Sequence, residues 1–320
     1  MKKILFAFAL FVSMLGTSWG QQPRTAEEFF NRGIEYLEKE NHNRAISDFT
    51  RVIGLAPRFA GAYFLRGLLY FDKKDYSKAI ADFTETIRLD SELAIHAFRN
   101  RGNTYFMKDD FDLAIADYNE AIRLNPGFAE TYYNRGTAYV IKEDNDRAIA
   151  DFTEAIKLNP EHAEAYYRRG RAYREKENND QAVADLTEAI KLNPGHIGAY
   201  ISRGYIYTRK DNFDEAIADY TKAIALDPKS SIAYNNRGWT YFLKKEYDKA
   251  IADCNQAIKL NSKYAAAYHS RGSAYLGKGD FNRAISDANA ALRIDPNHAY
   301  SKELLADAQA ARQQARQNRK

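Results

Sequence analysis

The sequence predicts an all-α fold, a solenoid built from helical hairpins that follow one another along the chain. An internal repeat is the first reason: the 320 residues contain an Arg-Gly pair eight times, with its glycines at 33, 67, 102, 136, 170, 204, 238 and 272. The spacing is 34 residues, apart from one step of 35 between Gly67 and Gly102. Periods of this size are typical of stacked arrays. The second reason is that every repeat carries two apolar stripes at helical spacing.

The same residue types recur at the same positions when this glycine is numbered position 8. Position 4 is aromatic, position 11 is Tyr and position 20 is Ala in all eight repeats, and position 32 is Pro in six. Positions 4, 8 and 11 lie on one helical face and positions 20, 24 and 28 on a second, with a polar turn between the two helices. Each repeat is therefore predicted to be a hairpin. Its Gly and Ala let the two helices approach closely, and its Pro ends the second helix.

Two places depart from the strict repeat. The inserted residue falls in the segment 90–94, where Ser91 stands in place of Pro, and we expect a lengthened helix or an altered turn there. After Pro296, an apolar stripe that includes Leu304, Leu305 and Ala308 predicts a capping helix over the last repeat, because terminal repeats need a polar outer face.

A recurring charged pair accompanies the glycine. Position 7 is Arg and position 23 is Asp in every repeat, and in an antiparallel hairpin these positions lie within about one helical turn of each other. We predict a structural Arg-Asp ladder, formed within each repeat or across to a neighbour. Its members are Arg32 and Asp48, Arg66 and Asp82, Arg101 and Asp117, Arg135 and Asp151, Arg169 and Asp185, Arg203 and Asp219, Arg237 and Asp253, and Arg271 and Asp287. Partly exposed pairs contribute roughly 0.2–1 kcal/mol each, so we expect the ladder to set the register of the helices rather than to supply most of the stability.

The order of an aromatic residue, Gly, Tyr, Ala and Pro at these intervals resembles the tetratricopeptide repeat family. The resemblance covers residues 26–298, in repeats 26–59, 60–94, 95–128, 129–162, 163–196, 197–230, 231–264 and 265–298. It implies a right-handed superhelical solenoid of helix-turn-helix hairpins, closed by a capping helix and basic tail at 299–320. It also implies a scaffold that binds another protein or a peptide.

The first 20 residues have the layout of a secretory signal peptide. Lys2 and Lys3 precede an apolar run at 4–15, and the small residues Ser18 and Gly20 follow. The run is shorter than the roughly 20 apolar residues that span a bilayer, so we expect cleavage after Gly20, with a retained anchor as the alternative. The sequence therefore predicts an exported protein of bacterial type, periplasmic or extracellular, in which residues 21–25 form a short linker.

Composition and motifs argue against several functional classes. Without Lys2 and Lys3 the formal charge falls from +4 to +2, which disfavours a nucleic-acid partner. The chain has no His-x-x-x-His pair, no glycine-rich phosphate loop and no Gly-x-Ser-x-Gly turn, so we predict no enzyme, no cofactor and no metal site. The single Cys254 excludes an intramolecular disulfide, and its position, where five other repeats carry Phe or Tyr, predicts a buried and inert thiol.

The family resemblance implies that the first helices line a concave groove and that positions 2, 5, 6, 9, 12 and 13 meet the ligand. The lining is aromatic and apolar with a polar, basic middle, which suits an extended or helical peptide better than a small metabolite. An alternative is that several of these aromatic side chains only pack between adjacent hairpins. The candidate peptide-binding residues are Arg99, Asn103, Tyr133, Asn134, Tyr167, Arg168, Arg171, Tyr205, Asn235 and Trp239.

Two finer resemblances concern the groove. Arg99, Asn103, Asn134 and Arg168 match four of the five residues with which heat-shock co-chaperones grip a terminal carboxylate, but Glu164 stands where the fifth, a base, belongs. Separately, position 6 resembles the asparagine ladder in the repeat domain of O-linked N-acetylglucosamine transferase. Its asparagines are Asn31, Asn100, Asn134 and Asn236, and other residues interrupt them.

Other functional interpretations stay open at this point. The chain would then be a structural or assembly factor of the cell envelope that uses its ends and convex face, or an accessory module that presents substrate to an enzyme. The tail carries Arg312, Arg316, Arg319 and Lys320 and no acid. A solvated helix end is the ordinary interpretation of this tail, and contact with an anionic membrane is the alternative.

Overall fold

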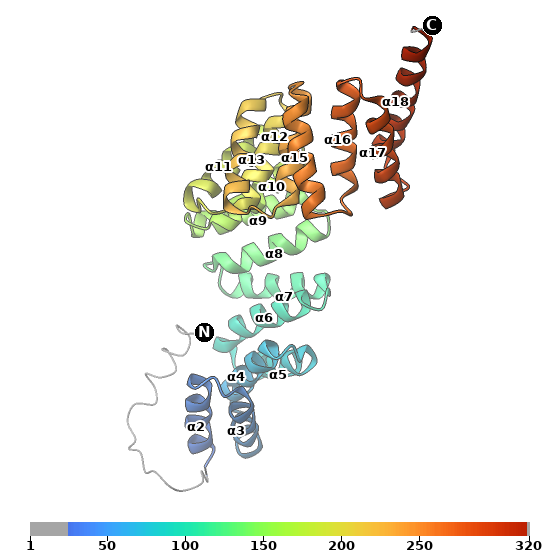
Figure 1. Cartoon of the computed structure of the whole chain (residues 1–320). Coiled ribbons are helices and arrows are strands. Elements are labelled where there is room, and N and C mark those ends of the chain that lie inside the picture. The colour runs from blue at the N-terminus through green and yellow to red at the C-terminus, as the bar shows by residue number, and fades with distance from the viewer. Residues whose placement is uncertain (1–24, 319–320) are drawn as a thin grey trace. The chain divides into compact units, whose positions relative to one another are not determined.

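The computed structural model describes residues 25–318, which form 17 helices, α2 to α18, and no strand. The predicted signal peptide lies outside the described residues, as do Arg319 and Lys320 of the tail. The chain divides into two units, here called the N-terminal unit, up to Leu158, and the C-terminal unit, from Asn159 onward. Each unit holds four of the eight repeats, and within each unit the hairpins follow one another as tandem pairs (Figure 1).

Each repeat contributes a first and a second helix. The first helices are α2 (Ala26–Glu38), α4 (Ala60–Asp72), α6 (Ser91–Phe106) and α8 (Ala129–Ile141), then α10 (Ala163–Glu175), α12 (Ile197–Arg209), α14 (Ser231–Leu243) and α16 (Ala265–Gly277). The second helices are α3 (His42–Leu55), α5 (Tyr76–Leu89), α7 (Phe111–Leu124) and α9 (Asn145–Leu158), then α11 (Asn179–Leu192), α13 (Phe213–Leu226), α15 (Tyr247–Leu260) and α17 (Phe281–Ile294). The last helix, α18 (Ala299–Gln317), packs on α17 and α16. The predicted all-α array of hairpins is confirmed.

Position 8 is the point of closest approach between the two helices of a hairpin. A Cβ on Gly102 would lie 2.8 Å from the ring of Tyr118 and 3.2 Å from the backbone oxygen of Ala114, which is position 20 of the same repeat. In the last repeat the ring is replaced by Ala288, and Leu304 of α18 reaches Gly272 instead, 2.8 Å from where a Cβ would stand. The capping helix therefore completes the core of the final hairpin.

The turn between the two helices uses a left-handed residue at position 15 of every repeat. Seven of the eight are not glycine, with φ between 56° and 62°, and the eighth is Gly279. The amide that follows donates to the carbonyl of the position 11 tyrosine, as Asp110 N does to Tyr105 O at 2.9 Å. This bond closes the end of the first helix and offsets the cost of the left-handed backbone.

The inserted residue lengthens a helix, as expected from the sequence. Helix α6 has 16 residues, whereas α4 and α8 have 13. Asp90 is both the C-cap of α5 and the N-cap of α6. As N-cap, its Oδ1 accepts hydrogen bonds from the amides of Glu92 and Leu93 at 2.8 and 3.0 Å. An N-cap carboxylate satisfies amides that the helix itself leaves unpaired, so α6 begins at Ser91 with no intervening loop.

Candidate functional site

The structure brings all eight predicted Arg-Asp pairs together, and it does so within each repeat. In the fourth repeat, Arg135 donates from Nε and Nη2 to the two carboxylate oxygens of Asp151, at 2.8 and 2.6 Å. The shortest nitrogen–oxygen distance is 2.6–2.8 Å in every pair, and the aspartates are 3–8% exposed. Such two-point pairing fixes the relative position of two helices as well as contributing energy.

The same arginines also link neighbouring repeats. The remaining nitrogen, Nη1, donates to a side chain of the preceding repeat, as from Arg101 to Thr84 Oγ1 at 2.8 Å and from Arg203 to Thr187 Oγ1 at 2.9 Å. The acceptor occupies position 25, which is Thr or Asn in all eight repeats. This recurrence of Thr or Asn is the signal in the sequence from which the contact between repeats could have been predicted. In these arginines, Nε and Nη2 donate to the aspartate and Nη1 donates to the preceding repeat. Because all three nitrogens already have partners, these arginines belong to the scaffold and not to a ligand site.

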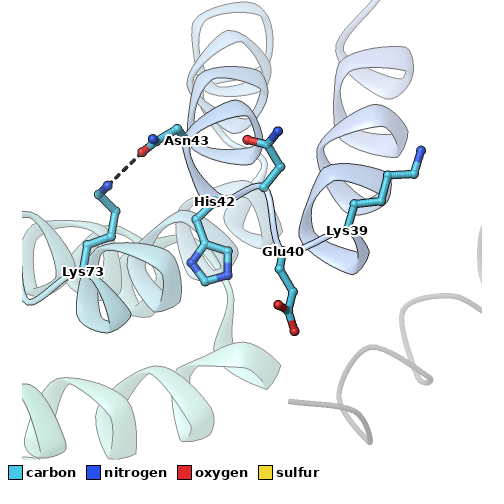
Figure 2. Close-up of a pocket in the computed structure, with 6 residues that line it drawn as sticks. Lys39, Glu40, His42, Asn43 and Lys73 are labelled. Carbon is cyan, nitrogen blue, oxygen red and sulfur yellow. Dashed lines mark hydrogen bonds between the residues drawn. The ribbon is translucent and has the colours of Figure 1, made fainter.

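A second link between repeats runs along the turn edge. A lysine at position 14 contacts position 18 of the preceding repeat, as Lys210 does with Asp180 at 2.7 Å and Lys73 with Asn43 at 2.8 Å. The Lys73 contact borders an open pocket of about 360 Å³ at the turn edge (Figure 2). The pocket is lined by Lys39, Glu40, Asn41, His42, Asn43 and Lys73. None of the predicted peptide-binding residues lies there.

Position 5, predicted to face the ligand, is largely a packing position. Its side chain lies against the residue at position 34 of the same repeat, which is the residue before the next first helix. Ring centroids are 5.0 Å apart for Phe30 and Phe59, and 4.4 Å for Tyr167 and His196. Position 34 is aromatic or His in six repeats, a signal that the sequence interpretation did not use. Tyr133 packs on the ring of Phe152 at 5.9 Å.

Asn235 shows the consequence most clearly. It is 6% exposed, and its Nδ2 lies 3.5 Å from the hydroxyl of Tyr264, again position 34. Its Oδ1 is buried without a hydrogen-bond partner among the described residues. The prediction that Asn235 meets a peptide therefore does not fit this conformation, because the Tyr264 side chain covers it.

Arg99 is the charged side chain among the position 5 residues. Its guanidinium lies over the ring of Phe128, again position 34, at 5.4 Å and is partly buried. Burial lowers its pKa, and the nearby charge of Glu130 partly opposes this effect. Within residues 25–318, no carboxylate forms an ion pair with Arg99. Its neighbour His96 packs between Phe64 and Phe128, and the buried Nδ1 of His96 also has no hydrogen-bond partner in this part of the chain.

Asn103 and Asn134 meet beside Arg99 on the first-helix face of the N-terminal unit. Asn103 is four residues after Arg99, on the same side of α6. Its Oδ1 accepts from Asn134 Nδ2 at 3.0 Å and from the Tyr118 hydroxyl at 2.8 Å. These two bonds orient the Asn103 amide and leave its NH₂ group as a donor.

Arg168, the fourth residue of the carboxylate-gripping resemblance, belongs to the C-terminal unit. Its Nε donates to Glu164 Oε1 at 3.0 Å, and His196 Nε2 donates to Glu164 Oε2 at 3.0 Å. The proton must be on Nε2, because His196 Nδ1 accepts from the Ala199 amide. The hydrogen bond from His196 is the main reason why the pKa of Glu164 is lowered. Glu164, the acid at the position where the carboxylate-gripping pattern has a base, therefore already accepts a hydrogen bond from the Arg168 guanidinium.

The other candidates of the C-terminal unit lie nearer the surface. Tyr205 is 40% exposed, and the Arg174 guanidinium stands 5.5 Å from its ring. Arg171 is exposed and stands 5.8 Å from the Tyr167 ring. Trp239 stacks at 4.9 Å on Phe242, which is also on α14. Among the predicted residues of the C-terminal unit, Tyr205 and Arg171 are thus exposed, and Trp239 is partly exposed.

The position 6 asparagines do not form one continuous ladder. Asn100 donates to the backbone oxygen of His96 at 2.7 Å, and Asn134 donates to Asn103. Asn236 lies at 3.4 Å from its neighbour Asn235. Each of these amides is thus bonded locally, on its own helix or on the preceding first helix.

Several remaining features can be placed directly. Cys254 is buried, and burial raises the pKa of its thiol, in keeping with an inert side chain. No group of His, Cys, Asp or Glu within residues 25–318 is arranged to hold a metal ion. None of the helices in that range combines the length and apolarity that crossing a bilayer requires. Arg312 of the basic tail lies 3.4 Å from Asn282, on α17.

Comparison with known families decides the family. Models described as tetratricopeptide repeat match residues 30–94 and 133–197, 231–264, and 265–298, and a model described as TPR repeat matches 102–141 and 204–245. The chain belongs to the tetratricopeptide repeat family. No curated protein sequence matches it.

Solved structures agree on the fold of this tetratricopeptide protein. A tetratricopeptide repeat protein from Parabacteroides merdae is similar with a TM-score of 0.59 at 23% identity, over 78% of this chain and 98% of that one. YrrB, described as a TPR protein with an unusual peptide-binding site, is similar with a TM-score of 0.53 at 28% identity, over 59% and 97%. MamA is similar with a TM-score of 0.51 at 29% identity, over 54% and 95%.

Proposed function

We propose that the chain is an exported scaffold that binds another protein, through a peptide segment of it, on the faces of its first helices, and that it catalyses no reaction. Tetratricopeptide proteins mediate protein and peptide interactions, and the YrrB structure is described as containing a peptide-binding site. The signal-peptide layout of the first 20 residues supports export.

The observation that carries the proposal is that no carboxylate within the described residues pairs with Arg99. A partly buried cation is costly unless a counter-ion and hydrogen-bond acceptors accompany it, and Glu130 acts on Arg99 only as a nearby charge, without an ion pair. The oriented amide of Asn103 offers a donor on the same side of α6. A peptide carboxylate would satisfy both groups with charge-assisted hydrogen bonds. The terminal carboxylate of an extended segment is the ligand that this geometry favours.

Synthetic peptides test the proposal. An array of random peptides of about ten residues is prepared twice, with free and with amidated C-termini, and incubated with the labelled mature chain, residues 21–320. We expect the strongest spots on the free-acid array and at least about tenfold weaker binding of those peptides by Arg99→Gln, since charged hydrogen-bonded pairs contribute on the order of 1.5–3 kcal/mol.

The matched control is Arg88→Gln. Arg88 lies in the same unit on α5, is exposed, and pairs only with Glu85 three residues away. Its substitution should leave the array pattern unchanged. Equal binding of free and amidated peptides, or unaltered binding by Arg99→Gln, would show that the Arg99 site is not the ligand site.

A further inference from the structure

The C-terminal unit carries exposed tyrosine rings next to its first helices, together with the partly buried rings of Trp239, Phe242 and His269. Tyr205 on α12 is 40% exposed and Tyr300 on α18 is 69% exposed. Trp239 of α14 occupies position 9, as Tyr205 does on the neighbouring first helix, and its ring lies 5.6 Å from His269 of α16. His269 in turn lies 6.1 Å from Tyr300. We call Tyr205, Trp239, Phe242, His269 and Tyr300 the aromatic face.

Positive charge surrounds this aromatic face. At the six ligand-facing positions of α10, α12, α14 and α16, the carboxylates are Glu164 and Glu175, and both are paired, with Arg168 and Arg174 respectively. Arg171 and Arg209 form no ion pair within the described residues, although Glu177, in the turn after α10, acts on Arg209 as a nearby charge. The face of these four helices therefore has an excess of arginine charge.

Two arginines lie beside the exposed Tyr205 ring. The Arg174 guanidinium stands 5.5 Å from that ring. Arg209 follows Tyr205 by four residues on the same side of α12, and a hydrogen bond with the Tyr205 hydroxyl is the main cause that raises the pKa of Arg209, with smaller contributions from Glu177 and Tyr300. Planar cations therefore stand beside an exposed ring.

We propose that the aromatic face docks an acidic peptide segment with an aromatic side chain between its carboxylates. The exposed rings offer stacking and apolar contact to the aromatic side chain, and the arginines, held over or beside tyrosines, offer two-point hydrogen bonds to Asp or Glu. A basic segment would be repelled by the same arginines. This inference rests on the proposed function, since it names the chemistry of a partner segment for the second of the two units.

Trp239 provides a direct readout. The sequence has two tryptophans, at 19 and 239, so the mature chain, residues 21–320, contains Trp239 alone. The probes are peptides that carry Asp-Phe-Asp several times in a Gly-Ser background, with amidated C-termini so that they offer no terminal carboxylate to Arg99. Matched probes carry Asp-Ala-Asp or Lys-Phe-Lys.

The expected result is a saturable change in Trp239 emission with the Asp-Phe-Asp peptide and at least about tenfold weaker binding of the other two probes. Tyr205→Ala and Arg209→Gln should each weaken the Asp-Phe-Asp peptide by about fivefold or more. Both side chains are exposed, so neither substitution should alter the helical circular dichroism. Arg99→Gln, in the other unit, should leave this titration unchanged.

The inference would be overturned by no response of Trp239, by equal affinity for the Lys-Phe-Lys probe, or by full binding by Tyr205→Ala together with Arg209→Gln. A Trp239 response to an oligosaccharide such as chitotriose, with none to the acidic peptide, would overturn it as well. If the Trp239 titration fails while binding of free-acid peptides still depends on Arg99, this inference is wrong and the proposed function stands. If binding of free-acid peptides does not depend on Arg99, the proposed function fails whatever the Trp239 titration shows.

Discussion

The two units share one scaffold but present different chemistry on their first helices. In the N-terminal unit, position 5 holds Phe30, Phe64 and the partly buried Arg99, which has no ion pair within the described residues. In the C-terminal unit, Tyr205 and Tyr300 are exposed, and the Arg174 guanidinium stands beside Tyr205. The same backbone therefore presents two different surfaces, one with a partly buried cation and one with exposed aromatic rings.

The difference teaches which positions are free to change. Positions 7, 8, 20 and 23 each contact a partner in the same hairpin, as Arg135 contacts Asp151 and Gly136 lies under Phe152. A substitution there disturbs packing or leaves a buried charge unpaired. A position 9 side chain such as Tyr205 extends into solvent, so its identity changes the surface with little effect on the hairpin.

Removing one ladder aspartate should have the largest effect on stability, and an equal one in both units. Asp151→Asn and Asp219→Asn keep the side-chain size but leave Arg135 and Arg203 without a counter-charge, so each should destabilise its unit by roughly 2–4 kcal/mol. Urea denaturation followed by circular dichroism measures the loss. Glu85→Gln, which breaks the exposed contact with Arg88, is the control and should not shift the midpoint. Clearly unequal losses would contradict a common scaffold.

An added methyl group at position 8 should have a smaller effect, again equal in the two units. A Cβ on Gly136 or Gly204 would lie 2.9 Å from the ring of Phe152 or Tyr220. Overpacking should outweigh the gain in helix propensity and leave a net loss of about 1–2 kcal/mol for each Ala variant. In α3, Gly54 has nothing within 4 Å of a Cβ, so Gly54→Ala should stabilise the chain. A loss at Gly54, measured by the same denaturation, would refute the steric explanation.

Acid should weaken the C-terminal unit through a partly buried histidine, His269. Burial, with a smaller contribution from His298, lowers the pKa of His269 from 6.5 to about 4, so folding keeps the imidazole neutral while the unfolded chain takes up a proton below pH 6.5. The contribution of neutral His269 to the free energy of unfolding is fully present above pH 6.5 and is lost as the pH falls toward 4. The loss between pH 7.5 and 5.5 should be about 1 kcal/mol. Trp239 fluorescence during urea denaturation of residues 21–320 reports this loss in the C-terminal unit. His269→Phe should remove most of it, and an unchanged loss in that variant would exclude His269 as the source.

Much of the fold could be predicted from the sequence because eight copies of one pattern reinforce each other. The hairpins, the close approach at Gly102 and the meeting of Arg135 with Asp151 all follow from positions that recur in every repeat. The left-handed turn residue did not stand out, because seven of its eight occupants are not glycine. The link from Arg101 to Thr84 was also missed, although position 25 carries Thr or Asn throughout.

The candidate site was harder to predict, and Arg168 explains why. Its repeat position matches a carboxylate-gripping base, but its charge is shared with Glu164, which His196 also holds from the end of the same repeat. Asn235 likewise has a ligand-facing position but lies under Tyr264. Glu164 is only four positions from Arg168 and was noted in the sequence, but His196 and Tyr264, which complete the two arrangements, are about 30 positions away in the chain, beyond the reach of local periodicity.

The sequence by itself determined the helical hairpins, their boundaries to within a few residues, and the scaffold pairs, because each depends on spacing within one repeat. Only the tertiary structure decided which variable side chains are covered and which are available: Tyr167 lies against His196, Tyr205 is exposed, and Arg99 forms no ion pair within the described residues. The physical reason is that burial and ion pairing depend on distances between helices, and those distances are set by packing of the neighbouring repeat.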